Sequence, residues 1–247
     1  MVTSAKVGLN RAEEEVSLFR APMKLISVHD AINRLPLPIL NLCSSLEEKS
    51  PPTAAHCRRV GYTAMELACF SYRFNADELR TIFHVGFLHD VGKLVVPLSI
   101  LDKPSGLSEA EWEVIRASAV CGESLLKPFL HPGDPVVDAV RHEHERWDGA
   151  GYPEGLYGEQ IPVASRIVHI ADTLDALRIH TAYRSARGIL ESMKVLMDGS
   201  GSQFDPDWVD LACRLWMPSQ NGPYKLQPTG NPPTSVPVAH NNRELSF

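Results

Sequence analysis

The stretch LRTIFHVGFLHDVGK, residues 79–93, has the pattern of a helix whose buried side ends in two ionisable residues. Its apolar positions recur at intervals of three and four, as on a helical face packed against a core: Leu79, Ile82, Phe83, Gly86 and Phe87. His89 and Asp90 lie seven residues after the second and third of these and so fall on the same face. A buried aspartate is unfavourable unless it is paired or bound to a cation. The stretch therefore predicts either a cation site or a helix end that emerges into solvent.

The same helical period extends over most of the chain. We expect about seven helices, over residues 54–72, 76–90, 108–126, 134–145, 162–179, 186–197 and 205–216. No segment shows a sustained alternation of period two, so the predicted fold class is all-α.

Composition changes at both ends of this helical region. Residues 1–50 form a predicted extension in which an apolar stretch, broken by Pro36 and Pro38, makes one or two short helices. They either pack on the following domain, predicted over residues 51–217, or mediate a homodimer. Residues 218–247 are rich in Pro, Asn, Gly and Ser, which predicts a disordered tail.

The overall composition excludes several classes of protein. The chain has 247 residues, is 44% hydrophobic and carries a formal charge of −6, so it has no basic surplus to attract a DNA or RNA polymer or an anionic membrane. Five scattered cysteines without a C-x-x-C pair favour a reducing compartment. The sequence shows neither an apolar run long enough to span a bilayer nor the apolar region of a signal peptide. We therefore expect a cytoplasmic protein that does not bind membranes.

Other ionisable residues also continue apolar helical faces. His56 begins the stripe of Val60, Ala64 and Leu67, and Asp172 lies four residues after Val168, with Asp175 three residues further on. In residues 134–145, Glu143 and His144 continue the apolar face, whereas Arg141 and Glu145 point away from it. Each residue also has a simpler interpretation: a core histidine with its hydrogen bonds satisfied, or a carboxylate that caps a helix or lies on the surface.

Taken together, these residues supply nitrogen and oxygen donors of the kind that Fe(II), Mn(II) or, less selectively, Zn(II) accept. They are not accompanied by a C-x-x-C pair, which argues against a structural zinc site. A cation held in this way with open coordination positions would chiefly activate a water.

Several segments, in this order, resemble the HD-GYP domains, a subgroup of the HD phosphohydrolases. The segments are HCRRV (56–60), HDVGK (89–93), LDKPSGLSEAEW (101–112), HERWDGAGYPEGL (144–156), IPVASRIVHIADTLDAL (161–177), YR (183–184) and FDP (204–206). The resemblance covers residues 53–216. It implies an all-helical fold with a centre of two or three metal ions that hydrolyses cyclic di-GMP, the bacterial second messenger, to pGpG or GMP.

The resemblance also implies roles for individual residues. The implied metal ligands are His56, His89, Asp90, His144 and Asp172, with Glu143 replacing a family histidine. Asp90 would bridge two ions and is the implied catalytic residue together with Lys93, which contacts substrate phosphate. Tyr183 and Arg184 would also bind the substrate. The loop that names the subgroup is formed by Asp148, Gly149, Gly151, Tyr152 and Pro153.

The chain departs from the family pattern at several positions. Ser118 and Glu143 stand where the family has histidines, and Pro52 stands where it often has a glutamate. Thr181 and Ala182 replace an arginine and a proline. We therefore expect one well-held ion and a second that is weakly held, and weakened hydrolysis of cyclic di-GMP.

Two alternatives remain open on the sequence. One is a non-catalytic HD-GYP module that binds a nucleotide or a signalling protein. The other is a mononuclear hydrolase of another phosphate ester.

Overall fold

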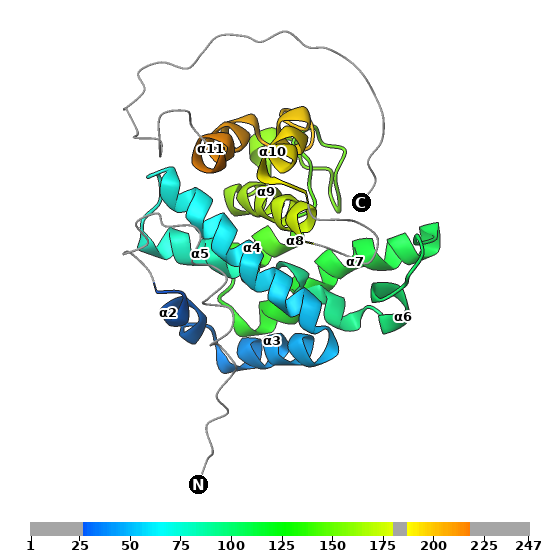
Figure 1. Ribbon diagram of the computed structural model, residues 1–247. Coiled ribbons are helices and arrows are strands. Elements are labelled where there is room, and N and C mark those ends of the chain that lie inside the picture. Colours follow the sequence, from blue (N-terminus) through cyan, green and yellow to red (C-terminus); the bar gives the residue numbers. More distant parts are fainter. Residues whose placement is uncertain (1–26, 180–186, 218–247) are drawn as a thin grey trace. The chain divides into compact units, whose positions relative to one another are not determined.

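The computed structural model describes residues 27–179 and 187–217, and these are helical apart from turns, loops and two isolated β-bridges (Figure 1). The α-helices are α2 (Val28–Asn33), α3 (Leu37–Lys49), α4 (Pro51–Phe70), α5 (Ala76–Leu88), α6 (Leu98–Leu101), α7 (Glu109–Leu126), α8 (Pro135–Arg141), α9 (Val163–Arg178), α10 (Ile189–Asp198) and α11 (Pro206–Trp216). Short 3₁₀ helices are η2 (His89–Val95), η3 (Lys127–Phe129) and η4 (Gly158–Gln160). The prediction of an all-α fold is confirmed.

Capping residues in the sequence set the start of two long helices. Asn75 precedes α5, and its side chain accepts hydrogen bonds from the backbone N–H groups of Asp77 and Glu78. Ser108 and Glu111 form the same reciprocal capping box at the start of α7. Such a cap stabilises a helix by about 1 kcal/mol, so both helices begin where their polar side chains replace the missing backbone acceptors.

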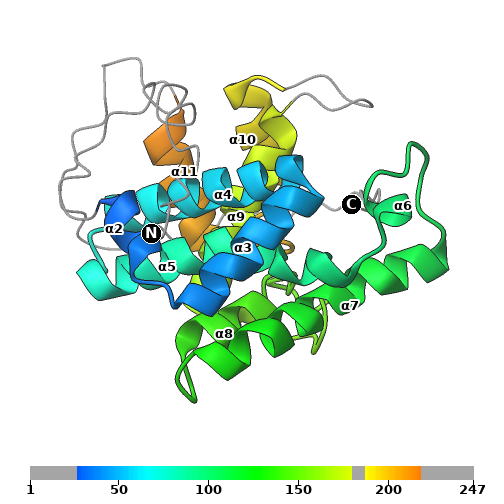
Figure 2. The same cartoon turned by 90° about the horizontal axis from the view of Figure 1, so that it is seen from below.

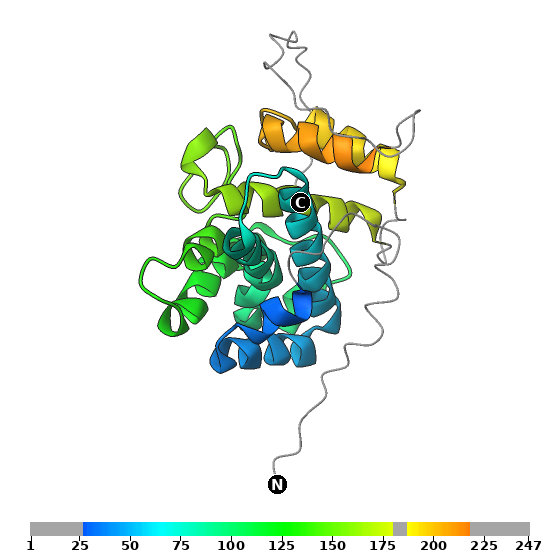
Figure 3. The ribbon, with the colours of Figure 1, turned by 90° about the vertical axis from the view of Figure 1, so that its left-hand side faces the viewer.

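Helices α4, α5 and α9 pack against one another at the centre of the fold. Helices α10 and α11 pack on α9 from one side, whereas α8 packs on α5 and α7 packs on η2 and α8 (Figures 1 and 3). The largest side chains of the core come from several of these helices and include Phe83, Ile167 and Trp208, each buried. The core therefore joins the segments that carry the predicted ligands.

The N-terminal helices belong to the same core. Ala31, Leu35 and Ile39, from α2, α3 and the turn between them, are buried in it, and Figure 2 shows α3 beside the central helices. The Lys49 Nζ, at the end of α3, donates to the backbone carbonyls of Leu94 and Val96, each at 2.6 Å. Of the two roles left open for this segment, packing on the domain is therefore the one observed.

Two glycines allow close approaches that shape the centre of the fold. A Cβ added at Gly86 of α5 would lie 2.8 Å from the Gly61 Cα of α4, so the two helices cross closely only without side chains there. A Cβ at Gly92 of η2 would lie 1.9 Å from the Ser118 carbonyl oxygen of α7. The first contact brings α5 against α4, and the second brings η2 against α7.

Two predicted helices end earlier than the apolar pattern indicated. The segment predicted to run to Asp90 leaves the α-helix after Leu88 and continues as the 3₁₀ helix η2. The segment predicted to run to Glu145 ends at Arg141. In both cases buried polar residues continue the covered face after the last α-helical residue: His89 and Asp90 follow Leu88, and His142 and Glu143 follow Arg141.

No helix among the described residues has both the length and the apolar character that crossing a bilayer requires. The predicted disordered tail at 218–247 lies outside the described residues, and so do Thr181, Ala182, Tyr183 and Arg184.

Candidate metal centre

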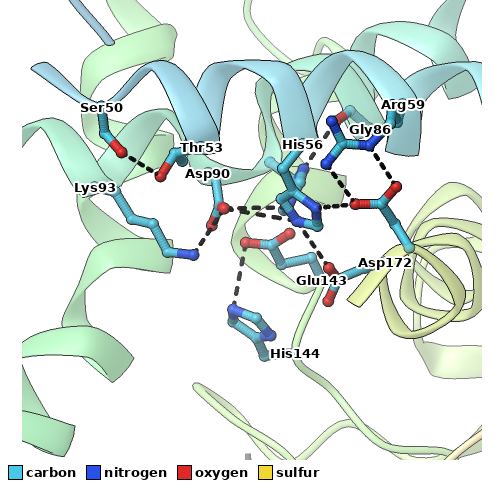
Figure 4. Close-up of polar contacts among 12 residues, drawn as sticks. Ser50, Thr53, His56, Arg59, Gly86, Asp90, Lys93, Glu143, His144 and Asp172 are labelled. Atoms are coloured by element: carbon cyan, nitrogen blue, oxygen red, sulfur yellow. Dashed lines mark hydrogen bonds and ion pairs between the residues drawn. The ribbon is translucent and has the colours of Figure 1, made fainter. Parts of the chain in front are cut away.

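Three of the predicted metal ligands meet at the junction of α4 and η2 (Figure 4). His56 comes from α4, and His89 and Asp90 open η2. One donor atom from each lies within 4.8 Å of the other two. The Asp90 Oδ2 is 3.4 Å from the His89 Nε2 and 3.9 Å from the His56 Nε2. The arrangement brings two imidazoles and one carboxylate together around a common point.

Both histidines direct the same ring nitrogen toward this point. The Nδ1 of His89 lies 2.8 Å from the backbone carbonyl of Gly86, to which it donates. The Nδ1 of His56 lies 2.7 Å from the Asp175 Oδ2. Because Nδ1 is the donor in each ring, Nε2 is the atom left to bind a cation. The donor set therefore fits a divalent metal.

Asp172 of α9 approaches the same ring from the other side. Its Oδ1 lies 3.0 Å from the His56 Nε2. Burial alone lowers the pKa of His56, but its hydrogen bonds to Asp172 and Asp175 outweigh burial and raise it to about 10. A proton consequently occupies Nε2 when no cation is bound, and a metal ion at this position would replace it.

Lys93 neutralises the buried carboxylate of the centre. Its Nζ lies 2.7 Å from the Asp90 Oδ2, and the Asp90 side chain is only 3% exposed. Burial opposes the charge of Asp90, but Lys93 and the two histidines hold its pKa well below the usual range. Burial lowers the pKa of Lys93, but the neighbouring Asp90 carboxylate raises it by more, so the pKa lies above its ordinary value. Lys93 therefore remains a cation beside the centre, with 26% of its side chain exposed.

Glu143 and His144 approach from the turn that follows α8. They lie beyond the end of that helix, so the prediction that they continue a helical face is wrong in its local structure. Glu143 is nevertheless buried, and its Oε1 lies 3.5 Å from the His144 Nε2. Burial and the charges of Asp90 and Asp172 raise the pKa of Glu143, whereas burial lowers that of His144 to about 4. His144 is therefore neutral, the form in which an imidazole binds metals.

Ser118 does not offer a donor to this centre. Its hydroxyl donates to the Ile115 carbonyl at 2.6 Å, within its own helix α7. The position at which the resemblance implied a histidine is therefore occupied by a side chain that hydrogen-bonds within its own helix.

The loop at residues 145–156 folds back on His144. Glu145, which was predicted to point away, is 2% exposed and accepts hydrogen bonds from the backbone N–H groups of residues 154–156, at 2.8, 3.1 and 3.1 Å. A Cβ at Gly151 would lie 2.6 Å from the Glu145 Cα, so the loop returns this closely only with glycine. The Tyr152 ring then lies 4.9 Å from that of His144. The loop thus packs on one of the candidate ligands.

Asp148 shapes the loop. Its carboxylate pairs with Arg146 at 2.7 Å and accepts from the Ala150 N–H at 3.0 Å. Gly149 has φ of +79°, in the left-handed region that favours glycine. Asp148 and Gly149 therefore stabilise the conformation of the loop.

A second group of possible ligands includes two residues of this loop, and its polar atoms already have other partners. His142, Glu145 and Glu154 come within 4.8 Å of one another. The His142 Nε2 lies 2.8 Å from the Glu154 Oε2, and Glu154 also forms an ion pair with Arg141. Glu145 accepts hydrogen bonds from backbone N–H groups of the loop. These residues therefore hold the loop.

The sequence reasoning missed Arg59 and left Asp175 undecided. The Arg59 Nε lies 2.7 Å from the Asp175 Oδ1, and the Asp175 Oδ2 lies 2.7 Å from the His56 Nδ1. Arg59 and Asp175 follow His56 and Asp172, respectively, by three residues. A spacing of one helical turn from a predicted ligand is the sequence signal that could have identified both residues.

A sequence model described as HD domain matches residues 42–208. The chain is 34% identical over 179 residues to the 3'3'-cGAMP-specific phosphodiesterase 2 of Vibrio cholerae, covering 72% of this chain and 34% of that protein. It is 34% identical over 194 residues to the cyclic di-GMP phosphodiesterase response regulator RpfG of Xanthomonas campestris, covering 77% and 50%. The chain thus spans half or less of the length of these relatives.

A crystal structure of a cyclic GMP-AMP specific phosphodiesterase from V. cholerae has the same fold. It aligns with a TM-score of 0.54 at 23% identity, over 72% of this chain and 47% of that one. The chain belongs to the HD domain family and, within it, to the HD-GYP branch.

Proposed function

We propose that this chain is a metal-dependent phosphodiesterase that hydrolyses a cyclic dinucleotide, with cyclic di-GMP and 3'3'-cGAMP as the two candidate substrates. The observation that carries the proposal is the convergence of His56, His89 and Asp90 within 4.8 Å, with Asp172 3.0 Å from His56. The names of the relatives supply the substrate class. Residues 51–217 are the proposed domain, in the cytoplasm, where five unpaired cysteines are stable.

In this proposal the two histidines, Asp90 and Asp172 hold one divalent ion, and Glu143 with His144 supports a second. Fe(II) or Mn(II) suits this mixture of imidazole and carboxylate donors. When bound, such an ion activates a water and neutralises charge that develops on the phosphate oxygens.

The side chains of the protein contribute positioning and charge. Lys93 is a cation whose exposed part can bind a phosphate oxygen, while its contact with Asp90 keeps that carboxylate ionised. Tyr183 and Arg184 remain predicted substrate contacts. We expect Lys93 to contribute mainly to substrate binding, since its charge is present before and after bond cleavage.

One observation favours a second candidate, a module that binds nucleotide without hydrolysing it. The Ser118 hydroxyl donates a hydrogen bond to a backbone carbonyl of its own helix, α7. The metal ligand that the family has at this position is therefore missing. Such a module could pair with a signalling protein or a second copy of this chain.

The test is hydrolysis of both cyclic dinucleotides by protein purified without oxygen and reconstituted with Fe(II) or Mn(II). Metal content is measured on the same sample, and His89→Ala serves as the control. Turnover that disappears in the control supports the phosphodiesterase. Bound metal and nucleotide with no turnover in either reconstitution would refute it and support the binding module.

A further inference from the structure

The His56 ring lies between two carboxylates from the same helix. Asp172 and Asp175 lie one turn apart on α9, and each faces a different ring nitrogen: Asp172 is 3.0 Å from Nε2 and Asp175 is 2.7 Å from Nδ1. Only the Nε2 side faces Asp90 and the candidate metal position. Asp175 therefore contacts the ring from behind and has no direct access to that position.

Asp175 is itself held by a bidentate ion pair. Arg59 donates from Nε to Oδ1 at 2.7 Å and from Nη2 to Oδ2 at 3.0 Å. The Asp175 side chain is 9% exposed. Two parallel bonds from a planar guanidinium fix the plane of the carboxylate as well as its position. Because His56 and Arg59 lie one turn apart on α4, a single carboxylate of α9 ties together two consecutive turns of α4.

This arrangement distinguishes His56 from the other imidazole. The Nδ1 of His89 donates to a neutral backbone carbonyl, whereas that of His56 donates to a carboxylate. A carboxylate behind an imidazole fixes its tautomer and orientation and makes the opposite nitrogen a stronger ligand.

We infer that Asp175 and Arg59 are positioning residues for His56, which hold its Nε2 toward the metal position without contacting a metal or substrate themselves. The inference rests on the proposed metal centre. Loss of such a partner weakens metal affinity by about 10–100-fold in other metal sites, and the same range is expected here.

The experiment measures the affinity of the full metal-free chain for Mn(II) by titration calorimetry. Arg59→Gln and Arg58→Gln form a matched pair, because they are the same substitution at neighbouring positions of α4. Arg58 instead pairs with Glu47 on α3, at 2.6 Å. We expect Arg59→Gln to weaken Mn(II) binding about 10-fold and Arg58→Gln to leave it unchanged.

Two substitutions of Asp175 separate orientation from charge. Asp175→Asn preserves the shape and a carbonyl acceptor for the Nδ1 proton but removes the charge, so its affinity should lie between those of wild type and Asp175→Ala. Circular dichroism and the melting temperature without metal show whether each variant folds. If Asp175→Ala does not fold, Asp175→Asn and Arg59→Gln still decide the question.

The outcomes distinguish this inference from the proposed function. Wild-type protein that binds neither Mn(II) nor Fe(II) would refute the proposed metal centre. Wild-type protein that binds Mn(II), with folded Asp175→Asn and Arg59→Gln variants that bind it within 2-fold of the wild type, would overturn the role of Asp175 and Arg59 alone.

Discussion

Gly92 lies between Asp90 and Lys93 on η2, at the closest approach of that helix to α7. A methyl group at this position would lie 1.9 Å from the Ser118 carbonyl oxygen and 2.7 Å from the Gly122 backbone nitrogen. Ordinary contacts begin at 3.4 Å, and both atoms are backbone, so rotation of a side chain cannot relieve the overlap. The Gly92→Ala substitution must therefore move η2 away from α7 by roughly 1.5 Å.

The size of the effect follows from two opposing contributions. Overpacking a buried position destabilises a protein by about 1–3 kcal/mol, and a clash between two backbones belongs at the upper end of that range. Replacing glycine by alanine also restricts the unfolded chain, which offsets about 0.4–1 kcal/mol. The expected net loss is about 2 kcal/mol, which corresponds to a fall in melting temperature of roughly 4–8 °C for a domain of this size.

The assay compares Gly92→Ala with Gly106→Ala by urea denaturation. A Cβ at Gly106 meets no atom within 4 Å, and its φ is not in the left-handed region, so that control should be neutral or slightly stabilised. Because Asp90 and Lys93 move with η2, turnover of Gly92→Ala should also fall, by about 100-fold for a displacement of 1 Å. A Gly92→Ala protein within about 0.5 kcal/mol of wild type, with unchanged turnover, would refute the reasoning.

Two further predictions concern ionisable residues. Lys93→Met leaves the Asp90 carboxylate buried without its partner and should destabilise the metal-free protein by up to about 3 kcal/mol. Calorimetry with Mn(II) should show a smaller loss because the ion compensates the charge, and equal losses in both states would contradict this account. Burial lowers the pKa of His84, whose Nε2 donates to the Ala31 carbonyl, below its ordinary value of 6.5. As the pH is lowered toward 6.5, the unfolded chain therefore binds more protons than the folded chain. The stability of wild type relative to His84→Gln should consequently decrease as the pH is lowered from about 7.5 to about 5.5. A difference between their denaturation midpoints that does not change with pH would argue against this.

The sequence predicted candidate ligands where polar residues continue an apolar stripe. His56, His89 and Asp90 were selected in this way, and the structure brings their donor atoms within 4.8 Å of one another, while their role as metal ligands stays a prediction. The period does not reveal where hydrogen bonding changes from α to 3₁₀, so the end of α5 at Leu88 was missed.

Contacts made across long sequence separations could not be predicted from periodicity. Glu145 bonds backbone groups nine to eleven residues further along the chain, and it is buried because the chain turns after Arg141. Arg59 meets Asp175 across a separation of 116 residues. Such partners can be identified only when the packing of the helices is known, since in the sequence each of these residues has the pattern of an ordinary surface charge.

The departures at Ser118 and Glu143 have opposite consequences for the proposed metal centre. Ser118 removes a donor, because its hydroxyl bonds within α7. Glu143 adds a third carboxylate near Asp90 and Asp172, and burial with these charges raises its pKa, so the metal-free centre holds its charge unfavourably. A divalent cation would relieve that repulsion, and a carboxylate favours a harder ion than the imidazole it replaces. The proposal therefore implies a centre with fewer donors but a stronger electrostatic demand for its ion.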